Sequence, residues 1–133
     1  MADAVTSQTI QDGERRAVLK FTNISDGTGE SAVTKIDVSA LATNSRGETC
    51  TEVAIHQMWW QCVGMGVEIL FDATADVPAI ILSENSNGHH DYSSFTAIPN
   101  NAGAGKTGDV KFTTLNAATG DAYTVILDVI KSY

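Results

Sequence analysis

Polar and apolar residues alternate with a period of two through most of this 133-residue chain, and this pattern constrains its fold more than any other feature. In the segment 109–114, for example, Val110 and Phe112 alternate with Lys111 and Thr113. Successive side chains of an extended strand point to opposite faces, so this alternation is typical of a strand with one buried face. No segment carries a clear 3.6-residue period over three turns. The sequence therefore predicts an all-β protein.

Turn-forming clusters of Gly, Asn, Asp and Ser separate about eight or nine strand-like segments. Short strands at regular spacing are typical of an antiparallel β-sandwich or a jelly-roll-like fold, and the length suits a single domain spanning 1–133. We expect residues 1–12 to form an extended arm or an edge strand. The expected strands are 5–11, 16–23, 33–38, 52–62, 67–71, 79–82, 92–98, 110–115 and 123–130.

Three local patterns give finer expectations. Two glycines, Gly64 and Gly66, lie between the strands 52–62 and 67–71, which predicts a hairpin. The segment 79–82 is apolar at every position, which predicts a strand buried on both faces. The segment 84–91 is polar and rich in Gly and Asn, which predicts a loop.

A glycine-rich stretch at 103–108 resembles a phosphate-binding loop, but two features exclude that reading. Asn100 stands where the motif requires its first glycine. The segment that follows predicts a strand, whereas a phosphate loop leads into a helix whose free N–H groups hold the phosphates. No Ser-His-Asp arrangement or pair of carboxylates stands out either. We therefore expect a non-enzymatic protein that uses no cofactor.

Charge and hydropathy bear on the partners. Sixteen acidic and eight basic residues give a net charge of −8, whereas phosphate binding needs clustered Lys and Arg. The basic pair Arg15-Arg16 is best read as part of a strand edge. No stretch approaches the ~20 apolar residues of a membrane helix, and 1–7 lacks the pattern of a secretory signal. We expect a protein made in a cytoplasm, with no nucleic-acid or membrane partner.

The cysteine and histidine residues predict neither a disulfide nor a metal site. If 51–61 is one extended strand, Cys50 and Cys62 lie about 35–40 Å apart, and a disulfide needs Cα atoms within about 7 Å. Both cysteines are therefore expected to be free thiols. His89, His90 and Asp91 are consecutive, so their side chains diverge, and we interpret them as part of a polar loop.

Trp59 and Trp60 mark the first candidate interface. Neighbouring residues on a strand face opposite ways, so one indole points into the core and the other points outward. Neither alternating set of the strand 52–62 is polar throughout, so the sequence does not decide which set faces the core. We expect both faces of this strand to be covered. An outward Trp anchors a protein interface or stacks on a sugar ring; packing under a loop is the remaining alternative.

The loop 99–108 is the second candidate interface. It is long for a connection between strands, and its small residues suit close backbone contact with a neighbour, although a merely flexible loop is the alternative. The candidate interface residues are Trp59, Trp60, Asn100, Asn101 and Lys106.

Four short sequence segments, spread over most of the chain, resemble a known group of proteins. They are DGTGESAVTK at 26–35, WW at 59–60 with GMG at 64–66, DYSSF at 91–95 leading to IPNNAG at 98–103, and IKSY at 130–133. Together they resemble small structural proteins of tailed bacteriophages, especially those of marine and cyanobacterial hosts. No catalytic or binding motif accompanies the resemblance, so it carries over no site residue.

The resemblance implies a virion structural protein that is made in the host cytoplasm. The implied role is a capsid decoration (cement) protein that binds the major capsid protein lattice and stabilises the head. A neck, tail or baseplate component and a glycan-binding module are the alternatives. The implied partners are the major capsid protein or other virion proteins and further copies of the chain, as a trimer. The arm 1–12 would add a strand to a neighbour's sheet edge.

Overall fold

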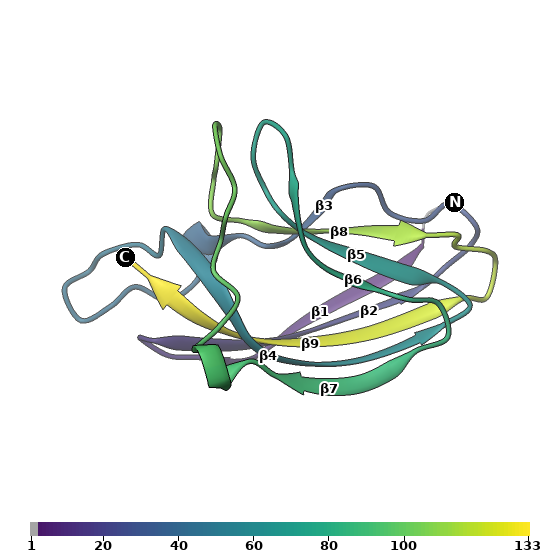
Figure 1. The fold of residues 1–133 in the computed structure, drawn as a ribbon, viewed down its shortest axis with the longest axis horizontal. Helices are drawn as coiled ribbons and strands as arrows, with labels where there is room; N and C mark the ends of the chain where they lie inside the picture. The colour runs from purple at the N-terminus through teal and green to yellow at the C-terminus, as the bar shows by residue number, and fades with distance from the viewer. Residues whose placement is uncertain (1–2) are drawn as a thin grey trace.

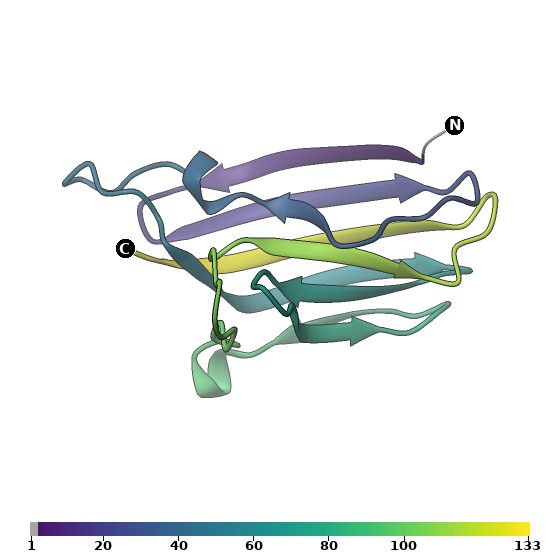
Figure 2. The ribbon, with the colours of Figure 1, turned by 90° about the horizontal axis from the view of Figure 1, so that it is seen from above.

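The computed structural model describes residues 3–133 and confirms the predicted all-β fold. Nine strands form two antiparallel sheets that pack face to face (Figure 1, Figure 2). Residues 1 and 2 of the predicted arm lie outside the described residues. The elements are β1 (Ala4–Asp12), β2 (Arg16–Ile24), β3 (Val33–Ile36), the 3-10 helix η1 (Val38–Ala40), β4 (Glu52–Val63), β5 (Gly66–Phe71), β6 (Val77–Leu82), β7 (Asn87–Asp91), the 3-10 helix η2 (Ser93–Phe95), β8 (Val110–Leu115) and β9 (Ala122–Ser132).

The strands β2 to β9 wind as a jelly roll. The five-stranded sheet has the order β1-β2-β9-β4-β7, and the four-stranded sheet has the order β3-β8-β5-β6. The chain crosses from one sheet to the other at every connection from β2 to β9 except the hairpin β5–β6. Eight antiparallel strands in two such sheets form a jelly roll, and β1 extends the larger sheet beyond β2.

The core lies between the sheets and is built by the predicted alternation. Phe21 on β2 meets Phe112 on β8 edge to face, with ring centroids 5.3 Å apart, and Phe112 meets Tyr123 on β9 at 5.7 Å. Val110 and Phe112 are fully buried, as the period-two pattern requires. The strand β8 covers the same residues as the expected strand 110–115.

The predicted arm is an edge strand of the protein's own sheet. β1 runs antiparallel to β2, from Ala4 opposite Ile24 to Asp12 opposite Ala17. Every residue from Ala4 to Gln11 is exposed, so β1 contributes almost nothing to the core. The strand is held by its ladder to β2 and by contacts at its two ends.

The predicted hairpin between 52–62 and 67–71 is wrong. β4 pairs with β9 and β7 in the five-stranded sheet, whereas β5 pairs with β6 and β8 in the other sheet. The turn at Gly64 therefore carries the chain across the sandwich. A short glycine turn is compatible with both arrangements, and β5, which is buried at five of its six positions, pairs with β6 and β8 on its two sides.

The expectation that 79–82 is buried on both faces is also wrong. β6 is an edge strand of the four-stranded sheet, and within 79–82 only Leu82 is buried. Ile81 is 58% exposed. Pro78 at the start of this strand is consistent with the edge, because proline cannot donate to a neighbouring ladder.

The segment 84–98 differs most from expectation. β7 occupies 87–91, where a loop was predicted, and it pairs with β4 from Gln57 opposite Asp91 to Gln61 opposite Asn87. His89, His90 and Asp91 therefore lie on a strand. The expected strand 92–98 is instead the helix η2 followed by a single bridge between Ile98 and Ile55.

A β-bulge explains the ambiguous pattern of β4. The register to β9 shifts between Ile55 and Gln57, so His56 is an extra residue. Val53 and Ile55 are buried before the bulge, and Met58 and Cys62 are buried after it. The two alternating sets exchange faces at His56, so the apolar residues of both sets point inward and one face of β4 stays open. The expectation that both faces of the strand 52–62 are covered is therefore wrong.

Cys50 and Cys62 are free thiols, as predicted. Both are buried, and burial raises the pKa of each thiol, which suits unreactive core cysteines. Among residues 3–133, no helix has the length and apolar character needed to cross a membrane.

Candidate functional site

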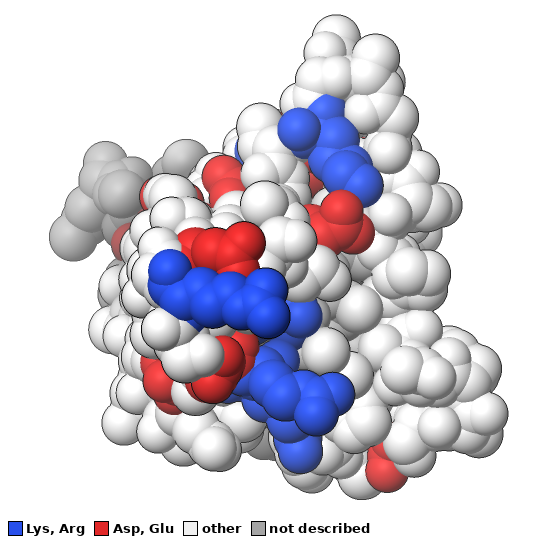
Figure 3. Space-filling view, turned by 90° about the vertical axis from the view of Figure 1, so that its left-hand side faces the viewer, with Lys and Arg blue, Asp and Glu red and all other residues white. Residues whose placement is uncertain are grey.

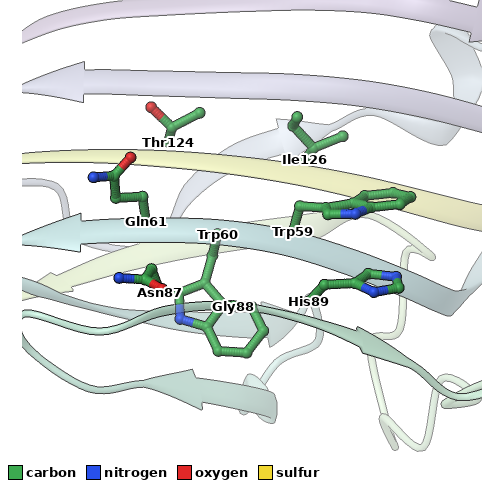
Figure 4. A pocket seen from close by; sticks show the side chains of 8 residues that line it. All are labelled: Trp59, Trp60, Gln61, Asn87, Gly88, His89, Thr124 and Ile126. Atoms are coloured by element: carbon green, nitrogen blue, oxygen red, sulfur yellow. The ribbon is translucent and has the colours of Figure 1, made fainter.

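The outer face of the five-stranded sheet carries an open hollow of about 590 Å³ over β9, β4 and β7 (Figure 4). Side chains on this face alternate with core residues, so the hollow is built by the outward positions of three neighbouring strands. The outward residues that line it are Trp59 and Gln61 of β4, Asn87 and His89 of β7, and Thr124 and Ile126 of β9. Trp60 and Gly88, which lie between them along β4 and β7, also border the hollow.

Trp59 is the outward tryptophan. Its side chain lies between those of Ile126 and His89, the residues opposite it on β9 and β7. The indole and the His89 imidazole stack with centroids 4.7 Å apart and planes 12° from parallel. Trp59 is 38% exposed, so a large apolar side chain borders the hollow while one face of its ring is covered by His89.

Trp60 points inward at the edge of the sandwich, so the prediction of one inward and one outward indole is confirmed. Its ring stacks on His90 with centroids 5.0 Å apart, and its Nε1 donates to the Ser86 hydroxyl at 3.1 Å. Gly88 lies opposite Trp60, and a β-carbon there would come within 3.3 Å of the indole. The absence of a side chain at Gly88 therefore leaves room for the Trp60 indole.

A chain of hydrogen bonds leads across the same face to the hollow. Arg16 on β2 forms an ion pair with the buried carboxylate of Asp128 on β9. Gln57 Nε2 donates to Asp128 at 2.8 Å, and Gln57 Oε1 lies 3.1 Å from His89 Nε2. Because Gln57 is fixed by Asp128, it orients the imidazole that stacks on Trp59.

The loop candidates lie outside the hollow and are tied to their own chain. Asn100 is buried, and its side-chain oxygen accepts from the Ala102 N–H at 2.9 Å. Lys106 forms an ion pair with Glu52 at 2.8 Å, and Asn101 is exposed. The structure therefore brings Trp59 and Trp60 together and separates them from the three loop residues. Asn101 and Lys106 are exposed, and of these two Lys106 is held by its ion pair with Glu52.

The loop 99–108 packs against the β5–β6 turn of its own chain. The Thr74 N–H donates to the Ala104 carbonyl at 3.1 Å, and the Thr107 hydroxyl donates to Asp72 at 2.6 Å. The two segments project together beyond the four-stranded sheet (Figure 1). A β-carbon on Gly105 would collide with Thr74, so the small residues serve an internal contact.

Basic side chains are largely neutralised by neighbouring acids. Figure 3 shows Lys and Arg lying beside Asp and Glu at one end of the molecule. The ion-paired basic residues are Arg16, Lys35, Lys106, Lys111 and Lys131. Among residues 3–133, no three His, Cys, Asp or Glu side chains form a group that could hold a metal ion.

Sequence reasoning missed most residues of the hollow. Gln61, Asn87, His89 and Thr124 reach it only because β7, β4 and β9 are neighbours. Amides, a hydroxyl and three aromatic side chains around one hollow can donate and accept hydrogen bonds and bury apolar surface. Such a surface is suited to binding.

No known protein family matches the chain, and no curated protein matches it.

Proposed function

We propose that the protein is a non-enzymatic virion structural protein, a capsid decoration protein that binds the major capsid protein through the outer face of its five-stranded sheet. The observation that carries the docking role is the exposed Trp59 beside the hollow. Large aromatic side chains in such positions often dominate binding energy. The virion setting comes from the resemblance of the sequence to tailed-phage proteins.

The fold supports the same setting by analogy. Jelly rolls occur in viral capsid and lectin domains, although a fold alone does not determine a function. The hollow lies on a sheet face, which is a rigid support for an interface. The surplus of acidic residues keeps the protein soluble before assembly.

The first experiment measures the copy number of the protein in purified virions by quantitative mass spectrometry against the major capsid protein. A ratio near one is expected for a lattice-wide decoration protein. A ratio far below one would overturn this role in favour of a neck, tail or baseplate component. Absence from the particles would overturn the virion role itself.

The second experiment tests the docking face. Trp59→Ala should reduce attachment to particles at least tenfold, the loss expected for an interface anchor worth more than about 1.4 kcal/mol. Phe95→Ala is the matched control, because Phe95 is an exposed aromatic residue of η2 outside the hollow. Equal attachment of both variants, with circular dichroism showing intact folds, would contradict docking through Trp59.

A glycan-binding module is the second candidate, and the polar lining of the hollow favours it. Gln61, Asn87 and Thr124 offer amide and hydroxyl groups beside an indole, which is the chemistry that recognises sugars. His89 covers one face of Trp59, so a sugar would stack on the other face. Titration with host surface polysaccharides should then quench tryptophan fluorescence, and the quenching should be lost in Trp59→Ala.

A further inference from the structure

We infer that the free edge of β1 is a pairing surface for a second copy of this chain, in which two β1 strands run antiparallel and join the five-stranded sheets into one. A strand at the edge of a sheet presents unpaired N–H and C=O groups along one side. β1 uses one side for β2, so its other side is open along the length of the strand.

Three of the four sheet edges carry features that discourage pairing with another chain. β3 has four residues, including Lys35, and its register to β8 is irregular. β6 contains Pro78. β7 has five residues and ends at the carboxylate of Asp91. Short strands, charges, prolines and irregularities are the devices by which proteins block unwanted edge pairing.

β1 lacks most of these features. It has nine residues, contains no proline and carries no charge before Asp12. Its ladder to β2 is regular from Ala4 opposite Ile24 to Thr9 opposite Leu19, and the one irregularity lies after Thr9. Six consecutive regular residues are enough to form a complete strand pair.

Both ends of β1 are fixed, so the edge is presented in a single conformation. At one end the Asp3 carboxylate accepts hydrogen bonds from Asn23, Asp26 and Gly29 at 3.0–3.2 Å. At the other end Asp12 forms an ion pair with the buried Lys131. An ordered strand pays little of the entropy cost that a flexible arm pays on binding.

The chemistry of β1 suits a copy of itself. Two antiparallel strands related by a two-fold axis pair residue i of one copy with residue j of the other and j with i, so the same stretch of sequence forms both sides of the contact. In 4–11 these are Ser, Thr, Gln and apolar side chains, and Thr–Thr and Thr–Ser pairs across strands are favourable. Each copy has a charge of −8, so a contact through an uncharged strand avoids direct repulsion between acidic side chains.

The test uses sedimentation velocity over a range of concentrations on the full chain and two variants of equal charge. Thr6→Lys with Gln8→Lys places lysines on the edge strand, and Thr43→Lys with Thr49→Lys places them on an exposed loop. Both variants lower the net negative charge, which favours association at long range. The edge variant should nevertheless weaken the dimer about tenfold, because like charges then oppose each other across the paired strands.

Hydrogen exchange provides a readout that does not depend on a variant. In the wild-type protein, β1 amides that face the open edge should become protected as concentration rises, while edge amides of β7 keep a constant rate. A monomer at all concentrations, a trimer, a dimer that the edge lysines leave unchanged, or protection at β7 in place of β1 would each overturn the proposal.

Discussion

Gly108 lies so close to the carbonyl oxygen of Thr51 that no β-carbon fits between them. Gly108 precedes β8, and Thr51 precedes β4, so this contact joins the end of the loop 99–108 to the start of β4, which lies between β9 and β7 in the larger sheet. Glu52 in turn forms the ion pair with Lys106. The loop is therefore fixed from two sides, by the β5–β6 turn and by the start of β4.

Gly108→Ala should therefore destabilise the protein more than Gly120→Ala. The two glycines have nearly equal φ angles, 89° and 90°, so an alanine costs about 1–2 kcal/mol in backbone strain at either site. A β-carbon at Gly120 has no atom within 4 Å, whereas at Gly108 it forces the backbone of Thr51 to move. We expect a further loss of about 1–3 kcal/mol at Gly108 in urea unfolding. Equal losses would show that the contact is not tight.

The sequence predicts the strands that lie between two neighbours. β8 and β9 have one face covered by the opposite sheet and one face open, so their residues alternate as expected. Which strands pair with one another is harder to predict from local sequence patterns. The partners of β4 are β9 and β7, which lie far along the chain or in a segment without an apolar pattern. No local signal distinguishes these pairings from the predicted hairpin.

β7 was missed because an edge strand needs little apolar surface. All five of its residues, Asn87 to Asp91, are exposed, and backbone pairing with β4 together with two ring stacks holds them. The candidate site depended on this strand. The two tryptophans could be selected from the sequence. Which of them faces outward could not be predicted, because it depends on the bulge at His56.

The two tryptophans should differ in their effect on stability. Trp60 packs against the core and donates to Ser86, so Trp60→Ala should cost about 3 kcal/mol in urea unfolding. Trp59 is on the open face, and Trp59→Ala should cost about 1 kcal/mol, from the lost stack on His89. A larger loss for Trp59 than for Trp60 would contradict the assignment of Trp59 to the surface.

Asp72 should contribute to stability above pH ~4 and lose this contribution in acid. The hydrogen bond from Lys111, followed by that from Thr107, lowers the pKa of its carboxyl group. The folded state therefore favours the charged form, and stability is lost as the pH falls from the unfolded value of about 4 through the folded pKa. Asp72→Asn should cost about 1 kcal/mol at pH 7, and this difference should shrink toward pH 3.

Asp109 is a control for Asp72, because its pKa is shifted in the opposite direction. Burial raises the pKa of its carboxyl group, so the folded state favours the neutral form and loses stability as the pH rises through the folded pKa. An asparagine keeps the oxygen that accepts from the Val38 N–H at 3.0 Å. Asp109→Asn should therefore leave stability unchanged or raise it at pH 7, with no difference at pH 3. A loss at pH 7 equal to that of Asp72→Asn would contradict this sign.

Lys131 should be the most sensitive lysine in the protein. Its side chain is fully buried, and its ammonium group donates to Asp12, to the Gly13 carbonyl at 2.6 Å and to the Ala42 carbonyl at 3.0 Å. Lys131→Met keeps the aliphatic chain but leaves these acceptors without their donor, so it should cost about 3 kcal/mol in urea unfolding. Lys20→Met on β2 is the control, because Lys20 has no ion pair among residues 3–133 and lies partly exposed; it should change stability by less than about 0.5 kcal/mol.

Because Asp12 also ends β1, Lys131→Met should speed amide exchange along β1 more than along β9, and equal acceleration in both strands would contradict this role of Lys131.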